Sequence, residues 1–561
     1  MKKIYNCFLL FAVSFGSLAQ STLITPGTSQ PNIIANGTHN GGITPPRMTN
    51  AQIAAIVAPV EGSLVYDTDI NCLRLFDGIS WKCQSENPKP IITGYSNGST
   101  SNQVGYDIEV TGEFVYVAGE FENEIIFQDD FGPIILYSSG GKDGFLAKLR
   151  KDGKLVWAKQ MANTLDCTAN QVKLDPEGNV YVAGTHKGSV TISGITFNNS
   201  NNLNDIFFAK YNSSGTFQWS QLMGGSGNDT LTAMAIDNNY KIHLTGGFES
   251  TFTFYGTGGS IGATAISAGL KDLFYAKYND LGAFLTHKAA GTSETSDLGT
   301  ALEVDPSNNV FLAGYIDLAE AIDIISIDGL NFSPTNPADA VNSAGFIAKL
   351  NPSAVCVAIV GADTYLPDAV LFNDGEIYVS SHAGYSISGI EGFSFPIPTP
   401  LIKISKFSIG LLKQWSRQMY YPNQVNNVLC DAGLTELTKR YKSDMTSGLN
   451  GSVYLSGNFF CNAMFGLSNI VSSGFVEFTP YSRGKSSNGK IDGVLMEYNS
   501  SGDLINIDNF GGSLSDEFTA IKATNTGELF GTGFYQNMVN WGTNSTTSMG
   551  GKDMFLLKII K

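Results

Sequence analysis

The sequence has few charged side chains, few histidines and no long apolar run suited to a membrane helix. Charged residues make up 15% of the 561 residues and apolar residues 42%, a balance that excludes an intrinsically disordered chain. The 34 Lys and Arg face 50 Asp and Glu, which gives a net charge of −16. Phosphate backbones repel such a chain, so nucleic acid is excluded as an expected partner. We also predict no transmembrane segment in the mature chain.

Motifs of catalysis and metal binding are missing as well. Neither the 7 Cys nor the 5 His show the spacing of a zinc site. The sequence contains no Gly-x-Ser-x-Gly elbow, no His-Glu-x-x-His and no phosphate-binding glycine loop. We therefore predict no catalytic residues and no cofactor. Ca²⁺ stays open as a ligand of acidic loops.

The first residues have the pattern of an export signal. Lys2 and Lys3 precede an apolar run at 7–13, and Ser17-Leu18-Ala19 is a small-residue cleavage site. This pattern predicts a signal peptide over 1–19 and an exported protein in the periplasm, at the outer-membrane surface or outside the cell. A buried N-terminal helix is the alternative interpretation.

Export permits disulfide bonds, and six cysteines follow the predicted signal peptide. Cys72 and Cys83 flank a short strand-turn-strand pattern and form the best candidate pair. Cys430 with Cys461 is a second hypothesis.

Two short motifs recur along the chain, as expected of a repeat protein. The first is an apolar strand that ends in small residues. Its seven copies begin at Phe114, Val180, Ile242, Val310, Ile377, Val453 and Leu529. The second reads Asp-x-Phe-x-Ala-Lys in its clearest form. Its copies are residues 143–148, 205–210, 272–277, 344–349, 402–406, 492–497 and 553–558. Short strands at even spacing, with helical patterns almost absent, predict a β-propeller.

Each repeat is predicted to form the four strands, A to D, of one blade. Strand A ends at a turn such as 175–178, the two motifs are strands B and C, and strand D carries Trp157, Trp219 or Trp415 in three repeats. Gly-Gly pairs at the end of strand D, such as 224–225, are interpreted as turns.

The predicted fold is all-β, a seven-bladed propeller closed by an N-terminal strand. The last repeat lacks strand D, whereas residues 90–95 resemble a strand D with no A, B or C before it. We expect 90–95 to supply the outer strand of the last blade, which covers an otherwise open edge.

Over residues 88–561 the sequence resembles the bacterial seven-bladed propeller repeat proteins known as SBBP repeat proteins. The segments 140–145, 155–159 and 178–184 carry this resemblance. An insertion within 423–451 departs from the pattern, leaves the sixth strand A unplaced and keeps six or eight blades as alternatives.

Residues 20–87 do not show the repeat pattern, and they predict an extended segment followed by a small module. Thr49 is placed to cap a short helix over 51–56. The Pro-Arg-Met-Thr and Leu-Val-Tyr-Asp-Thr segments resemble a module at the N-terminus of many exported Bacteroidetes proteins. The resemblance implies envelope or extracellular placement and does not assign an activity.

A recurring acidic residue shortly before strand A is the main site hypothesis. The B-to-C connections are long and should emerge, together with the D-to-A connections, on the top face of the propeller. The acidic residues are Asp107, Asp166, Asp229, Asp297, Asp368 and Asp516, with Asp431 as the possible sixth-blade equivalent. They either form a ring that binds a cation or basic ligand, or accept backbone N–H groups and fix their own turns. His186 and His382 each follow a strand B.

These patterns favour a noncatalytic binding or scaffold protein of the cell envelope that recognises an envelope protein or glycan through its top-face loops. One alternative is a glycan-active hydrolase or lyase at the channel mouth, which needs two carboxylates about 5–10 Å apart. Another is a structural subunit of a surface assembly.

Overall fold

The computed structural model divides the chain into two compact units, residues 1–86 and 87–561. The described residues are 45–68, 72–76, 78, 81–83, 95–96, 101–199, 201–318, 323–333, 343–362, 365–383, 402–420, 443–459, 462–467, 483–486, 491–541 and 544–559. The predicted signal peptide, Asp431 and the pair Cys430 and Cys461 lie outside them. No helix in this described part is long and apolar enough to cross a membrane.

The first unit is a small four-stranded sheet with one short helix. Its elements are β1 (Arg47–Met48), α1 (Asn50–Ala54), β2 (Leu64–Asp67), β3 (Cys72–Phe76) and β4 (Trp81–Cys83). The Thr49 hydroxyl accepts a hydrogen bond from the Gln52 N–H, and the Gln52 side chain accepts one from the Thr49 N–H. This capping box confirms the predicted cap. The side chains of Cys72 and Cys83 lie outside the described part, so their disulfide stays a prediction.

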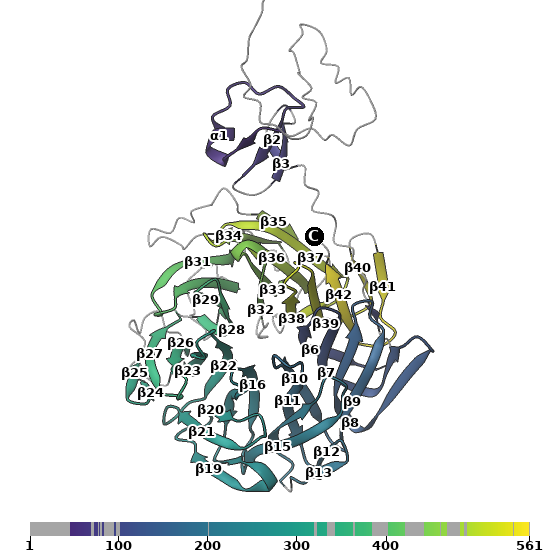
Figure 1. The fold of residues 1–561 in the computed structure, drawn as a ribbon, viewed down its shortest axis with the longest axis vertical. Helices are drawn as coiled ribbons and strands as arrows, with labels where there is room; N and C mark the ends of the chain where they lie inside the picture. The colour runs from purple at the N-terminus through teal and green to yellow at the C-terminus, as the bar shows by residue number, and fades with distance from the viewer. Residues whose placement is uncertain are drawn as a thin grey trace, which may run out of the picture. The chain divides into compact units, whose positions relative to one another are not determined.

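The second unit is a β-propeller, and the pairing of its described strands gives seven four-stranded blades (Figure 1). The A strands are β6 (Gln103–Val110), β10 (Cys167–Leu174), β16 (Thr230–Ile236), β22 (Asp297–Val304), β28 (Tyr365–Asn373), β32 (Asp444–Ser447) and β38 (Glu517–Ala523). The B strands are β7 (Phe114–Gln128), β11 (Val180–Lys187), β17 (Ile242–Phe248), β23 (Val310–Asp317), β29 (Glu376–Ala383), β33 (Val453–Phe459) and β39 (Leu529–Tyr535). The all-β propeller prediction is confirmed, and β32 supplies the sixth strand A that the sequence left unplaced.

The outer half of each blade holds the second motif and the tryptophan strand. The C strands are β8 (Pro133–Arg150), β14 (Asn204–Tyr211), β20 (Asp272–Tyr278), β26 (Ser343–Leu350), β30 (Ile402–Ser408), β36 (Asp492–Tyr498) and β42 (Asp553–Ile559). The D strands are β9 (Leu155–Asn163), β15 (Phe217–Gly225), β21 (Phe284–Ala290), β27 (Cys356–Gly361), β31 (Lys413–Tyr420), β37 (Leu504–Gly512) and β5 (Tyr95–Ser96). The Gly-Gly pairs end β15 and β37 and are not turns, so that interpretation was wrong.

The ring closes inside the last blade. β5 pairs antiparallel with β42, with Tyr95 opposite Leu556 and Ser96 opposite Phe555. The A strands contact one another in sequence, and β38 contacts β6. The Thr519 hydroxyl donates to the Gly105 carbonyl oxygen at 2.5 Å across that junction. An N-terminal strand therefore completes the last blade as predicted, at 95–96, while residues 90–94 lie outside the described part.

Most B-to-C connections form hairpins that extend the preceding blade. In four hairpins the first strand pairs with the D strand of the preceding blade. These hairpins are β12 (Val190–Ile192) with β13 (Ile195–Phe197), β18 (Thr251–Tyr255) with β19 (Ile261–Ile266), β34 (Asn462–Leu467) with β35 (Arg483–Ser486), and β40 (Met538–Trp541) with β41 (Asn544–Thr547). β24 (Ile325–Ile327) and β25 (Leu330–Phe332) form a separate pair. Two single-turn helices, η1 (Thr257–Gly259) and η2 (Leu449–Gly451), complete the described elements.

In the first five blades, the last residue of the second motif is a lysine that joins its blade to the next. The lysine ammonium donates to a backbone carbonyl in the C-to-D turn of the following blade, for example Lys148 to Ser213 at 2.9 Å and Lys277 to Pro352 at 2.7 Å. The indole of Trp219 donates to the Asp280 carbonyl at 3.0 Å in the same kind of turn. These repeated residues are therefore part of the fold, and the site has to be sought elsewhere.

Candidate functional site

Three of the predicted acidic residues occupy one equivalent position, just before or at the start of strand A. Asp229, Asp297 and Asp516 are 0%, 0% and 3% exposed. Asp229 accepts the Glu249 N–H at 3.2 Å, and Asp516 accepts the Gly512 N–H at 2.6 Å. These carboxylates fix the upper corners of their blades, the role proposed above as the alternative to ligand binding.

Two of these carboxylates face the aspartate of the preceding blade's second motif. Asp205 and Asp229 share a side-chain hydrogen bond. A contact between two carboxylates needs a proton, because an ionised carboxylate can only accept. Burial raises the pKa of Asp229 to about 8 and that of Asp205 to about 6. Burial also raises the pKa of Asp297 to about 6, and the charge of Asp272 contributes. The junction of Asp205 and Asp229 therefore holds a proton at neutral pH, whereas the Asp297 carboxyl loses its proton as the pH rises through about 6.

The other three acidic residues lie at other levels, so the six do not form one ring. Asp166 is exposed and accepts the Lys142 N–H at 3.3 Å. Asp368 is the bulged residue of β28, where the register shifts between Pro367 and Ala369. Asp107 lies one residue beyond the equivalent bulge in β6.

Asp107 belongs to an ion-pair cluster at the lower end of the channel, where the A-to-B turns lie. Its carboxylate accepts from the Lys173 ammonium at 2.7 Å and from the Val172 N–H at 2.8 Å. Glu109 pairs with Lys173 at 3.4 Å and with Lys522 at 3.0 Å. Burial raises the pKa of Glu303 in the same cavity to about 7. This cavity has a volume of about 530 Å³, and its wall carries charges of both signs among apolar and uncharged polar residues.

The upper end of the channel has different chemistry. A cavity of about 570 Å³ opens where the A strands begin and the B strands end. Asp166, Asp368 and Glu517 are its acidic lining residues. Its other polar lining residues carry hydroxyl or amide groups: Tyr106, Thr168, Thr185, Thr230, Thr232, Thr300, Thr519, Asn170, Asn204 and Asn458. Among the polar groups of the upper mouth, uncharged donors and acceptors therefore outnumber carboxylates.

The two cavities meet at the bulge of strand A. Thr232, Thr300 and Thr519 are the bulged residues of their strands and line both cavities. The Thr232 hydroxyl donates to the Gly299 carbonyl of the next blade at 2.6 Å. Sequence reasoning missed this level, although a recurring signal was present: Thr-Ala at 232–233, 300–301 and 519–520.

His382 was one of two histidines expected near the top face, and it lies beside Asp368. Its Nδ1 is 2.8 Å from a carboxylate oxygen of Asp368, which also accepts from the Ser443 hydroxyl at 2.9 Å. The Asp368 carboxylate therefore contacts both the imidazole and the Ser443 hydroxyl. His186 is 0% exposed, and burial lowers its pKa to about 4, so it is a packing residue.

In the part of the chain that the structure describes, no group of three or more His, Cys, Asp or Glu side chains is arranged to hold a metal ion. The prediction that the chain binds no cofactor stays untested, and Ca²⁺ stays an open hypothesis.

Comparison with known proteins gives three similarities. Residues 25–102 match the model of a phage tail-like trimerisation region. The chain is 23% identical over 253 residues to the uncharacterized WD repeat-containing protein L264 of Acanthamoeba polyphaga mimivirus. That match covers 38% of this chain and 18% of the viral protein, so the chain spans less than a fifth of that relative.

Two solved structures are also similar, at low TM-scores. The C-terminal WD40 domain of Sif2 has a TM-score of 0.31 at 6% identity, with 83% of this chain and 98% of that chain covered. The computationally designed Ika8 protein has a TM-score of 0.29 at 9% identity, with 82% and 98% covered. The strand pairing shows that the chain is a β-propeller repeat protein, and the similarity to a WD repeat-containing protein agrees with this.

Proposed function

We propose that this chain is a noncatalytic exported binding or scaffold protein of the cell envelope that recognises a protein or a glycan at the upper mouth of its propeller. The observation that carries the proposal is the cavity of about 570 Å³ lined mainly by threonine and asparagine. Hydroxyl and amide groups bind neutral polar ligands, such as sugar hydroxyls or peptide groups, without the desolvation cost of buried charges. Envelope placement rests on the export pattern of residues 1–19.

The first unit supports an assembly role. Residues 25–102 resemble a trimerisation region, and Val57, Val60 and Leu64 are 91%, 74% and 41% exposed. Apolar side chains with such large exposed fractions favour contact with another protein surface. We propose that three copies associate through this unit, so that three propellers bind together with the gain in avidity that linked sites provide. We also retain the SBBP-type, Bacteroidetes origin as a proposal, on the motif segments quoted above.

The test is affinity capture of the tagged protein from crosslinked native cells, followed by mass spectrometry and a glycan array. The mouth variant T185L/N204L removes polar groups from the upper cavity, and S447L/N525L is the matched control at the lower one. We expect one envelope partner or glycan class that the mouth variant loses and the control retains. A ligand that both variants retain would exclude the upper mouth as its site.

A further inference from the structure

The first blade has a projecting hairpin, here called the arm, that consists of residues 124–137. Its two strands are continuous with β7 and β8, and it pairs Glu124 with Tyr137 and Gln128 with Pro133. A bulge at Asn123, whose φ is 53°, separates it from the blade. The four described B-to-C hairpins that pair onto the preceding blade are separate elements, so the arm differs from them.

Both faces of the arm carry apolar side chains. Ile125 and Phe127 are 0% exposed and pack on Phe145 in the core of the blade. On the opposite face, Ile135 and Tyr137 are 38% and 63% exposed. Strand alternation ordinarily places polar residues on the side that faces water. An apolar outer face is therefore a sign of an interaction surface.

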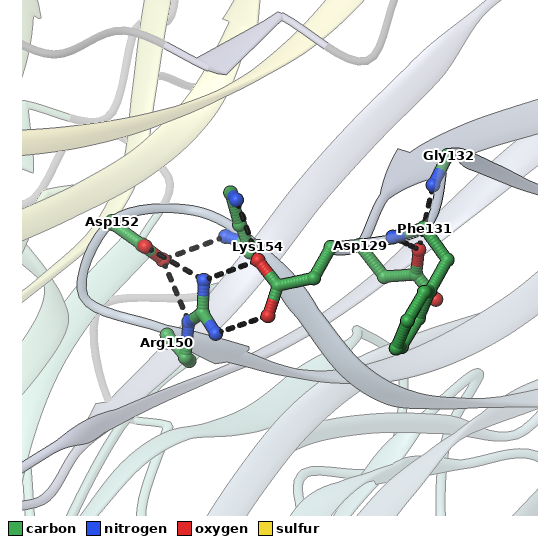
Figure 2. A network of polar contacts seen from close by, with 7 residues as sticks. Asp129, Phe131, Gly132, Arg150, Asp152 and Lys154 are labelled. Atoms are coloured by element: carbon green, nitrogen blue, oxygen red, sulfur yellow. Dashed lines mark hydrogen bonds and ion pairs between the residues drawn. The ribbon is translucent and has the colours of Figure 1, made fainter.

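The tip of the arm displays Phe131, which is 98% exposed. The Asp129 carboxylate accepts the N–H groups of Phe131 at 2.7 Å and Gly132 at 2.9 Å, as Figure 2 shows. The Asp129 N–H in turn donates to the Gly132 carbonyl oxygen at 3.0 Å. A tip that is ordered before binding loses less conformational entropy when a partner covers it.

The charges at the base of the tip are paired with one another. Asp130 accepts from Arg150 at 2.7 Å and from Lys154 at 2.5 Å, and Arg150 also pairs with Asp152 at 2.9 Å. Figure 2 shows Arg150, Asp152 and Lys154 gathered in this network. The hydrogen bonds from Arg150 and Lys154 lower the pKa of Asp130, so it stays ionised within these pairs.

The paired charges beside the tip bear on the kind of partner. Two copies of a chain with a net charge of −16 repel each other over most of their surface. Pairing of Asp130 and Asp152 with Arg150 and Lys154 reduces that repulsion beside the tip, and the exposed apolar side chains gain by burial. The arm fits a second copy of this chain better than it fits a strongly charged partner.

The root of the arm also contacts the end of the region that is similar to the trimerisation model. Asn102 is the last residue of that match. Its side-chain amide donates to the Glu122 carboxylate at 2.8 Å, and its carbonyl accepts the Glu122 N–H at 2.9 Å. The end of the matched region and the root of the arm are therefore one hydrogen-bonded structure.

We propose that the arm is a self-association surface, on which Phe131, Ile135 and Tyr137 pack against another copy of this chain. The inference rests on the proposed assembly of copies and adds a second contact to it, made by the propeller.

The test is sedimentation velocity of the full chain over a range of concentrations, in a double-mutant cycle. The arm variant is F131S/I135S/Y137S, and the variant of the first unit is V57D/V60D. The control, I266S/L281S, changes two apolar side chains of the third repeat that are 75% and 65% exposed. Substitutions of central interface anchors weaken association by about tenfold or more. We expect that loss for the arm variant and none for the control.

The cycle separates the two proposals. We expect V57D/V60D to retain weak, concentration-dependent association that the arm substitutions abolish. An arm variant that trimerises with unchanged affinity, while V57D/V60D is monomeric, overturns the inference about the arm and leaves the assembly proposal standing. A native chain that stays monomeric throughout overturns both.

Discussion

A single glycine near the end of strand D shows how closely the blade corners are packed. A Cβ built on Gly224 would lie 2.0 Å from an oxygen of Asp205, and the equivalent atom on Gly291 would lie 2.3 Å from Cγ of Asp272. The glycine therefore leaves room for the aspartate of the second motif. From the sequence alone the pair at 224–225 was interpreted as a turn, because glycine marks turns and close approaches equally well.

Gly291→Ala should destabilise the propeller by about 1–3 kcal/mol, because the added methyl group overlaps the buried Asp272 carboxylate. The measurement is the midpoint of urea-induced unfolding. Gly112→Ala is the control, since a Cβ there meets nothing within 4 Å. Equal midpoints for the two variants would contradict the packing argument.

At the scale of elements, the junction between β14 and the start of β16 gives a pH dependence. The Asp205 and Asp229 carboxyls share a proton there, and Glu249 and Lys271 are the other charged groups that the junction brings near. The ordinary pKa of aspartate is about 3.9, so the folded protein binds the proton more tightly than the unfolded chain does. The stabilisation is complete below about pH 4 and is lost as the pH rises through about 8.

Asp229→Asn should flatten this dependence, because an amide keeps a hydrogen-bond donor in place at every pH. The free energy of unfolding of the variant is expected to fall less between about pH 6 and pH 9 than that of the native protein. Chemical denaturation at a series of pH values measures both slopes. Parallel curves would show that the junction does not hold the proton.

The sequence predicted the strands far better than the site. Strands B and C were predicted at their observed places because apolar alternation and the Asp-x-Phe-x-Ala-Lys motif repeat along the chain. The acidic residues were aligned by their distance from strand A alone. A difference of a few positions places Asp229 in a corner, Asp368 at the bulge and Asp107 in the lower cavity. Bulges are not readable from residue type, so the ring could not be resolved from the sequence.

At the scale of the whole molecule, the last blade is the one in which strands C and D are far apart along the chain. β42 and β5 pair through Leu556 and Phe555, whereas β20 and β21 of the third blade are joined by the turn at 279–283. Hydrogen exchange should be about tenfold or more faster at the amides between β42 and β5 than between β20 and β21, because local opening there is not limited by a short turn. Mass-spectrometric exchange of the native protein measures both; similar protection would contradict this expectation.

The thermal stability of the whole protein should not depend on divalent metal. We expect the Tm with a chelator and the Tm with millimolar Ca²⁺ to agree within about 2 °C, since a tightly bound ion would stabilise the folded state by mass action. Differential scanning calorimetry measures both. A clear rise with Ca²⁺ would revive the acidic residues as ligands.

Closure inside a blade also orders events in time. β5 leaves the ribosome long before β42, because residues 97–552 separate them. Six blades are complete in the chain before the seventh has its strand C, so no ring exists until β42 has been made. A premature stop anywhere upstream of residue 553 leaves an unclosed row of blades with bare edges, a natural target for quality control.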